Sequence, residues 1–317
     1  MNPEVSLIEA TVRVSGFRGY LFTGKLVKTI ILRSNPSLSK FFEPSRAGPP
    51  KLIHVSPLFR LEANGIKCEY SSVDCSRDLM AKCNGEPSIV SLDGIYRFYL
   101  GLHRDVAYYA DVLSNLINNI QGCFEFMDQK VCVEPLEFKY VDVVATGNRL
   151  AREVLESGGA KIVFSSPVML RDPFKLVSKF KSFVPTPMNV FAAPLYSFLY
   201  TRGLYSIKRF RLELLRLHRI FNETYTLFKS LRLKWVYYNL KPEPALTGFV
   251  NYRLNRDYLS FLREKGITVE EWLGNILAYT IALGVGVGRA TGFGHVSIKP
   301  LRETDSLPLD VHSNHFI

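Results

Sequence analysis

Apolar and polar residues alternate from residue 5 to residue 15, a period of two that is typical of a half-buried strand. The segments that follow have helix or strand spacing: a helix over 21–34, strands over 51–62 and 88–103 with a turn at Asp93-Gly94, a helix over 105–120, and a strand or hairpin over 123–133. The order is β-α-β-β-α-β. This is the split βαβ pattern of a ferredoxin-like domain, which RNA-recognition folds also use.

The same order recurs after a connecting segment, residues 136–159. Its members are a strand over 161–170, helices over 189–200 and 206–228, strands over 232–240 and 247–254, a helix over 256–283 interrupted near Gly266, and a strand over 295–301. We therefore predict an α+β protein with two tandem ferredoxin-like (RRM-like) domains. Residues 1–135 would form the N-terminal domain and residues 136–317 the C-terminal domain.

The net charge of the chain indicates what kind of partner the protein binds. Lys and Arg number 40 against 29 Asp and Glu, which gives a net charge of +11. An excess of this size favours a polyanionic partner, and nucleic acid is a better candidate than an anionic membrane. No apolar run reaches the ~18 residues of a membrane span, and no secretion signal begins the chain. We therefore expect a cytoplasmic protein with no membrane partner.

The five cysteines contain no C-x-x-C pair, and their spacings do not match a zinc site. Cys123 and Cys132 could face each other across a hairpin. A disulfide is unusual in a cytosol unless the source is a hyperthermophile, so buried free thiols are the favoured interpretation. We expect neither a metal ion nor a cofactor.

A glycine-rich stretch connects the last helix to the last strand. Five of its twelve residues, 283–294, are glycine, and Arg289 is its only charge. Its position excludes a Rossmann fingerprint, which lies between a strand and a following helix, and it lacks the Gly-Lys of a P-loop. Two interpretations stay open: a loop whose amides contact phosphate, or a loop that lets a helix and a strand pack closely.

Two groups of cations are candidates for contact with phosphate. Between Ser206 and Phe221, an apolar stripe lies opposite Lys208, Arg209, Arg211, Arg216 and Arg219, with Glu213 as the only acidic residue of this stretch. This face is either solvated or follows an RNA backbone. In the first helix, Lys25 and Lys28 share one face.

Lys51 opens the strand after that first helix, where the helix residues of a β-α-β unit can approach it. A plain surface role is the alternative for each of these lysines. His54 is expected on the opposite face of the strand from Lys51, so we do not expect it to be catalytic.

Four stretches match a known family: Gly19 to Gly24, Pro50 to Leu58, Ser166 to Val168, and Gly284 to Gly294. With them, the chain resembles the CRISPR-associated endoribonucleases that cut precursor CRISPR RNA within its repeats, members of the RAMP superfamily, and in particular the histidine-lacking archaeal type. The resemblance implies two ferredoxin-like domains and metal-independent cleavage. In that reaction the ribose 2′-OH attacks the adjacent phosphate, expels the 5′-oxygen and leaves a 2′,3′-cyclic phosphate.

The resemblance also implies the site. Some family members have a tyrosine, a histidine and a lysine, which correspond here to Lys28 (or Val27), Glu43 and Lys51. The histidine is thus missing, and members without it are thought to use clustered lysines and arginines. We expect Lys28 to act as acid or base, Lys51 to stabilise the phosphorane or protonate the leaving group, and Lys25 to assist. Arg232 is a fourth catalytic candidate.

The RNA-binding candidates are the residues of the glycine-rich stretch and of the basic helix: Gly284, Gly286, Gly288, Arg289, Gly292, Gly294, Lys208, Arg209, Arg211 and Arg216. The expected partner is CRISPR repeat RNA, as precursor and product. Effector-complex subunits and a second copy of the chain are further expected partners. One alternative is a non-catalytic RAMP subunit that binds guide RNA. Another is a generic two-domain RNA-binding protein, but the chain lacks the Lys/Arg-Gly-Phe-Gly-Phe motif of such proteins.

Overall fold

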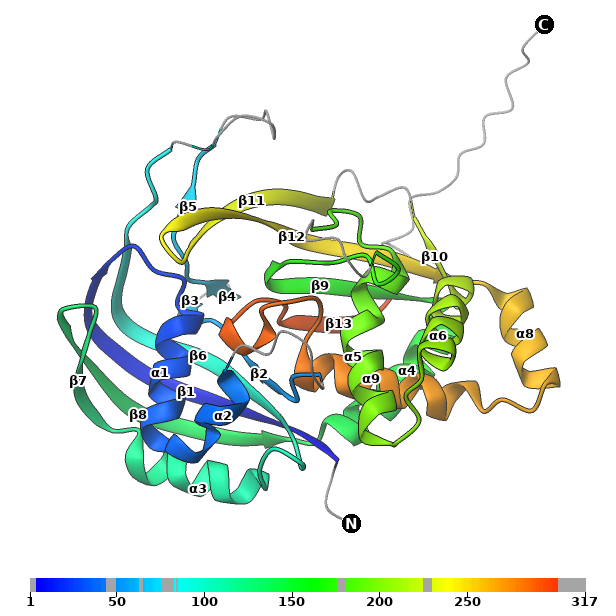
Figure 1. Ribbon diagram of the computed structural model, residues 1–317, viewed down its shortest axis with the longest axis horizontal. Helices are drawn as coiled ribbons and strands as arrows, with labels where there is room; N and C mark the ends of the chain where they lie inside the picture. The colour runs from blue at the N-terminus through cyan, green and yellow to red at the C-terminus, as the bar shows by residue number, and fades with distance from the viewer. Residues whose placement is uncertain are drawn as a thin grey trace, which may run out of the picture.

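The fold consists of two antiparallel sheets covered by helices (Figure 1), which confirms the predicted α+β class with two ferredoxin-like units. The computed structural model describes residues 4–43, 50–62, 65–75, 83, 85–175, 181–224 and 230–301. Within these residues, no helix is both long and apolar enough to cross a bilayer. Residues 302–317 lie outside them.

The first sheet has the strand order β4-β3-β6-β1-β8-β7, and β2 also pairs with β6. Its strands are β1 (Val5–Gly19), β2 (Ile53–Val55), β3 (Phe59–Glu62), β4 (Gly65–Cys68), β6 (Val90–His103), β7 (Gly122–Phe126) and β8 (Gln129–Val141). Its helices are α1 (Gly24–Ser34), η1 (Pro36–Leu38), α2 (Ser39–Phe42) and α3 (Tyr109–Asn119). The buried faces of α1 and α3 share one apolar core with β1 and β6. Strands β2, β6, β1 and β8 supply the four positions of the ferredoxin-like pattern.

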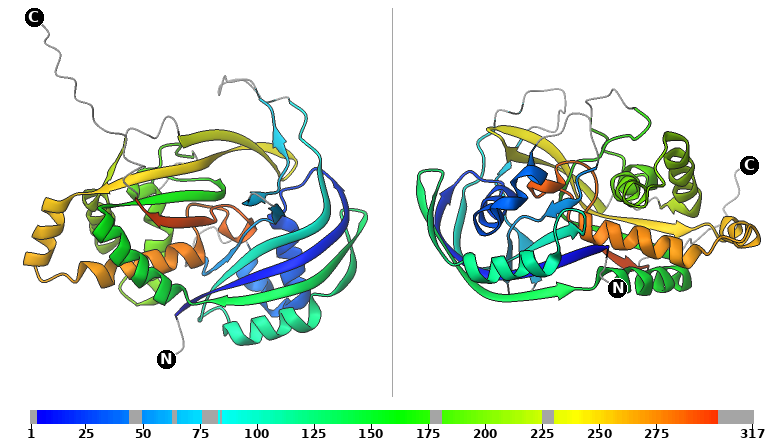
Figure 2. Two further views of the ribbon diagram at one scale, coloured as in Figure 1. Left: turned by 180° about the vertical axis from the view of Figure 1, so that it is seen from behind. Right: turned by 60° about the horizontal axis from the view of Figure 1, so that its bottom comes forward.

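The second sheet has the order β13-β9-β12-β11-β5, and β10 pairs with β12. Its strands are β5 (Ser72–Val73), β9 (Gly159–Val168), β10 (Phe221–Glu223), β11 (Leu231–Tyr238), β12 (Lys241–Leu254) and β13 (Val296–Pro300). Its helices are α4 (Val143–Ser157), α5 (Pro187–Thr201), α6 (Ile207–Ile220), α8 (Arg256–Glu264), α9 (Val269–Leu283) and η2 (Arg289–Thr291). The β11–β12 hairpin, yellow in Figures 1 and 2, extends from this sheet toward the first half of the chain.

Three predicted elements differ from the structure. Strand β6 continues through the expected turn at Asp93-Gly94, because Gly94 takes a φ of 154° and the register of β1 shifts opposite it. The helix expected over 206–228 ends at Ile220, where the chain turns into β10 and pairs with β12; residues 225–229 lie outside the described part. Helix α4 occupies the segment that we expected only to connect the two copies.

The two halves interlock. Strand β5 follows β4 in the first half of the chain, yet it pairs with β11 of the second sheet at Ser72 and Val73. Strand β8 runs through residues 135 and 136, where we placed the domain boundary. The division into residues 1–135 and 136–317 stays a prediction.

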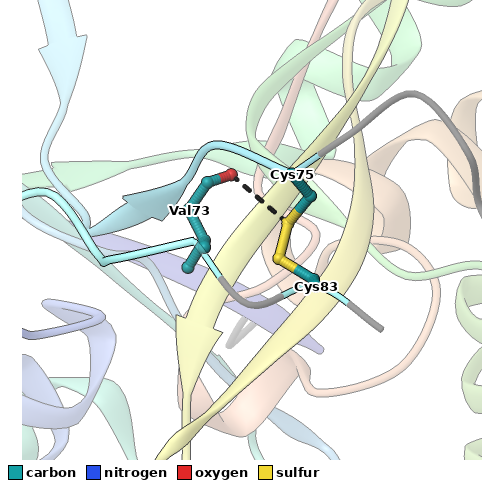
Figure 3. The surroundings of a disulfide bond; sticks show 3 residues. All are labelled: Val73, Cys75 and Cys83. Atoms are coloured by element: carbon teal, nitrogen blue, oxygen red, sulfur yellow. Dashed lines mark hydrogen bonds between the residues drawn. A yellow bond between two sulfur atoms is a disulfide. The ribbon is translucent and has the colours of Figure 1, made fainter. Parts of the chain in front are cut away.

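Four of the five cysteines form disulfides, so the interpretation as free thiols is wrong for them. Cys123 pairs with Cys132 across the β7–β8 hairpin, where the two residues are direct cross-strand partners. Cys75 pairs with Cys83, and the Cys75 sulfur lies 3.7 Å from the carbonyl oxygen of Val73 (Figure 3). Cys68 is free, and burial raises the pKa of its thiol.

Candidate functional site

The glycine-rich loop is a junction between the two halves. Gly284, Gly286, Gly292 and Gly294 are buried and all take positive φ. A side chain on Gly292 would come within 2.8 Å of the Gly24 Cα at the start of α1, so the backbones touch there. Glycine is needed at this contact because it combines a φ of 109° with the absence of a Cβ.

The amides of this loop are largely used inside the protein. Val285 N–H donates to Gly294 at 2.9 Å, Val287 N–H donates to Met169 at 2.9 Å, and Gly294 N–H donates to Pro167 at 3.0 Å. These bonds favour the packing interpretation of the loop. Contact between its glycines and RNA stays a prediction.

Arg289, which we expected to face RNA, is 7% exposed. Its guanidinium donates to the carbonyl oxygens of Leu283 and Lys51, both at 3.1 Å. Burial lowers its pKa to about 10, so it stays charged at neutral pH. Arg289 thus holds the backbone of Lys51 and places a fixed positive charge beneath it. Sequence reasoning missed this role, because an arginine among glycines usually indicates an exposed loop.

A buried histidine pair lies under the same loop. His54 Nδ1 is 3.0 Å from the carbonyl oxygen of Arg289, and its Nε2 is 3.2 Å from His295 Nδ1. Since the carbonyl can only accept, His54 carries its proton on Nδ1 and accepts from His295 through Nε2. Burial lowers the pKa of His295 to about 3. The pKa of His54 is lowered well below its usual range, mainly by burial and in addition by the neighbouring His295 and Arg289. Both rings are neutral and enclosed, and His54 is not available as a catalytic base.

Lys28 and Lys51 come together as expected. Lys28 projects from α1 with its ammonium 5.2 Å from the Phe42 ring centre, and the Lys51 ammonium donates to the Glu43 carbonyl oxygen at 2.6 Å. Both side chains are half-buried. Burial lowers the pKa of each lysine, and the positive charges of Lys28 and Arg289 lower that of Lys51 further, against the opposing effect of Glu43. Their proximity follows from the β-α-β geometry used to predict it.

Lys25 and Arg232 lie outside this pair. The Lys25 ammonium is 5.0 Å from the ring centre of Tyr238, and burial alone lowers its pKa. Arg232 is exposed on β11, six residues from Tyr238. At about 3.3 Å per residue, that separation is about 20 Å along the strand. Lys25 therefore borders the site, whereas Arg232 is at the far end of the strand from it.

The cations of the basic helix α6 are of two kinds: some are exposed to solvent, and one forms an ion pair with a buried carboxylate. Lys208, Arg209 and Arg211 are exposed, as expected for a surface that contacts phosphate. Arg216 instead turns inward to Glu213, which is 5% exposed, with 2.6 Å between its Nη1 and the carboxylate. Trp272 Nε1 donates to the same carboxylate at 3.1 Å. Arg216 is thus committed to an internal ion pair, a difference from the predicted exposed face.

A cavity of about 360 Å³ opens beside Lys51, and Tyr200 at the end of α5 forms part of its wall. Sequence reasoning missed this cavity because its walls come from both halves of the chain. Among the residues that the structure describes, no group of three or more His, Cys, Asp or Glu side chains could hold a metal ion.

Comparison with known proteins gives structural matches only: no family model matches the sequence, and no curated protein does. A Cas6 product complex matches with a TM-score of 0.58 at 15% identity, covering 93% of this chain and 100% of its own. The chain has the fold of Cas6 proteins. Thermus thermophilus Cas6 matches with a TM-score of 0.51 at 15% identity, covering 93% of this chain and 98% of its own.

Two further solved structures share this Cas6-like fold. One is described as a RAMP protein binding different RNA substrates, with a TM-score of 0.50, 11% identity, and coverage of 93% of this chain and 99% of its own. The other is a partial Cas6-RT-Cas1–Cas2 complex, with a TM-score of 0.53, 11% identity, and coverage of 99% of this chain and 48% of its own. At these identities the matches establish the architecture, and the chemistry depends on the residues of this chain.

Proposed function

We propose that the protein is a metal-independent endoribonuclease that cleaves precursor CRISPR RNA within its repeats. The observation that carries this proposal is the half-buried pair Lys28 and Lys51, with the charge of Arg289 beneath it, in a chain with the Cas6-like fold. Three positive groups at one place suit the negative charge that builds up on a phosphorane.

The reaction needs one group that accepts a proton and one that donates it. A base removes the 2′-OH proton, the 2′-oxygen forms a bond to phosphorus, and the bond from phosphorus to the 5′-oxygen breaks. An acid protonates the departing 5′-oxygen, and the products are a 2′,3′-cyclic phosphate and a 5′-hydroxyl end. No water is consumed, and the proton taken by the base balances the one given by the acid.

Two lysines can share these roles because they interact. Mutual repulsion makes the first proton of the Lys28–Lys51 pair easier to lose, and the remaining ammonium then holds its proton more firmly. The singly protonated pair contains one base and one acid. Glu43, at the position of the missing histidine, contributes its backbone carbonyl as a fixed acceptor for Lys51.

A second function is favoured by one specific observation. The lysine pair lacks a histidine, and a similar fold is described for a RAMP protein that binds different RNA substrates. The chain would then hold repeat RNA without cutting it, and its lysines would bind phosphate only. Cleavage assays decide between the two functions.

The deciding experiment uses a repeat RNA from the CRISPR array of the organism that encodes this chain. We expect wild-type protein to cut it in excess chelator and to leave a cyclic phosphate end. A copy with a 2′-deoxy nucleotide at the mapped cut site should stay intact, because the nucleophile is missing. Binding of the unmodified RNA without any cleavage would establish the non-catalytic function instead.

Substitution separates the two lysines. Lys51→Ala and Lys28→Ala should each slow single-turnover cleavage by about 10²–10⁴-fold, the usual contribution of acid–base groups. Arginine keeps the charge but does not give up its proton, so the lysine that acts as base cannot be replaced by Arg, whereas a purely electrostatic lysine can.

The matched control is Lys130→Ala, on the exposed β7–β8 hairpin, which should cut at the wild-type rate. Normal cleavage by both Ala variants of the pair would remove this site from the mechanism.

A further inference from the structure

The cavity beside Lys51 has the composition of a nucleobase pocket. Its volume of about 360 Å³ falls within the range of small-molecule sites. The residues of its wall that carry the inference are Lys40, Phe41, Glu43, Lys51, Asp105 and Tyr200. Phe41 precedes the last residue of α2 in the first half, and Tyr200 lies near the end of α5 in the second. The pocket therefore exists only when the two halves are together.

Two aromatic residues line this pocket, Phe41 from the first half of the chain and Tyr200 from the second. Tyr200 is 41% exposed, so an incoming base can reach its ring. Phe41 is half-buried, and the ammonium of Lys40 lies 4.9 Å from its ring centre. An unpaired base gains affinity by stacking on such a ring, whatever its sequence.

The charges of the pocket favour a base over a phosphate. Lys40 and Lys51 are balanced by Glu43 and Asp105, two cations against two carboxylates. A phosphate would be repelled by the carboxylates, whereas the amino groups of cytosine or guanine can donate to them. The uncompensated positive charge lies next to the pocket, at Lys28 and Arg289.

We infer that this pocket holds the unpaired base of a nucleotide that flanks the scissile phosphate, stacked on Tyr200. This inference rests on the proposed function, because Lys51 both lines the pocket and belongs to the lysine pair. The stacked base fixes the position of its own ribose and phosphate. The pocket thereby selects which phosphodiester meets the lysines.

The test measures stacking without cleavage. Uncleavable repeat RNA, with 2′-deoxy at the cut site, carries the fluorescent base 2-aminopurine at one nucleotide at a time along the repeat. We expect wild-type protein to quench the fluorescence at a nucleotide next to the cut. Tyr200→Ala should abolish the quenching there and weaken binding about ten-fold, whereas Tyr200→Phe keeps both because the ring remains.

Two controls complete the design. Tyr205→Ala removes a tyrosine of the same half that is equally exposed, at 40%, and does not line the pocket, so it should leave the quenching unchanged. RNA that is abasic at the quenched nucleotide should bind wild type and Tyr200→Ala equally, since both lack the stack.

The outcomes separate this inference from the proposed function. Quenching that survives in Tyr200→Ala, or that occurs only far from the cut, overturns the inference that the pocket holds a base next to the scissile phosphate. Cleavage by the wild-type protein would then still support the proposed nuclease function. Quenching that depends on Tyr200 in a protein that never cuts supports an RNA-binding pocket and overturns the nuclease. Equal loss of affinity by Tyr200→Ala for intact and abasic RNA also overturns the pocket.

Discussion

Single residues of this chain carry charges whose roles depend on burial. Arg289 and Arg216 were both expected to face RNA, yet one donates to backbone carbonyls and the other to a buried carboxylate. Lys208 and Arg211 remain exposed, although the same helical charge pattern suggested them and Arg216 alike. A charge pattern indicates a face of a helix, but it does not show which long side chains turn inward to a partner.

Arg216 gives a prediction at this scale. Arg216→Ala leaves the Glu213 carboxylate buried with only Trp272 and a longer 3.9 Å contact to Arg209. We expect the free energy of unfolding to fall by about 3–5 kcal/mol, as for other broken buried pairs. The measurement is urea unfolding followed by circular dichroism.

The double variant Arg216→Ala/Glu213→Gln tests the cause. The neutral amide can still accept from Trp272 and needs no cation, so much of the lost stability should return. If the double variant is less stable than Arg216→Ala alone, the unpaired charge is not the cause.

At the scale of elements, regular hydrophobic spacing predicted most of the helices and strands. It did not predict which strands pair over long distances in the sequence. The two β-α-β-β-α-β series follow from local hydrophobic patterns, and so does the approach of α1 to Lys51. Helix α4 had the necessary signals, since Asp142 accepts from the amides of Val144 and Ala145 and Gly158 ends the helix at a φ of 75°. It was missed because the repeat pattern had no place for an additional helix.

Helix α6 gives a prediction at this scale. If its exposed face follows an RNA backbone, Lys208→Ala and Arg211→Ala should each weaken binding of repeat RNA and reduce the slope of log affinity against log salt by about 1. Filter binding over a range of KCl concentrations measures both quantities. An unchanged slope in both variants would mean that this face is only solvated.

At the scale of the molecule, the two halves are joined by buried polar groups as well as by apolar packing. His54 comes from β2 in the first half and His295 precedes β13 in the second, and they bond to each other beneath the glycine-rich loop. The sequence could not predict this pair, because nothing local relates two residues so far apart. The candidate pocket was missed for the same reason.

The histidine pair makes stability depend on pH. The pKa of each ring is lowered in the folded protein, so the unfolded chain binds protons that the folded protein does not. The stabilisation is therefore complete above about pH 6.5 and is lost as the pH falls from there toward the folded pKa values. In this range the free energy of unfolding should fall by up to about 1.4 kcal/mol per pH unit for each histidine.

Thermal unfolding between pH 7.5 and 4.5 measures this effect. His295→Asn keeps a donor for His54 Nε2 but removes one titrating ring, so its unfolding temperature should fall less steeply with decreasing pH. The same slope in variant and wild type would assign the acid sensitivity to other groups.

Strand β5 has a consequence for the order in which the protein is made. On the ribosome, Ser72 and Val73 emerge about 160 residues before their partners in β11, at Trp235 and Val236. During that interval β5 has no strand to pair with, and β11 would later present an open edge if β5 were absent. Strand β5 can therefore join the second sheet only after β11 has been made, and a C-terminal fragment produced alone would leave the edge of β11 at Trp235 and Val236 open to pairing with other chains.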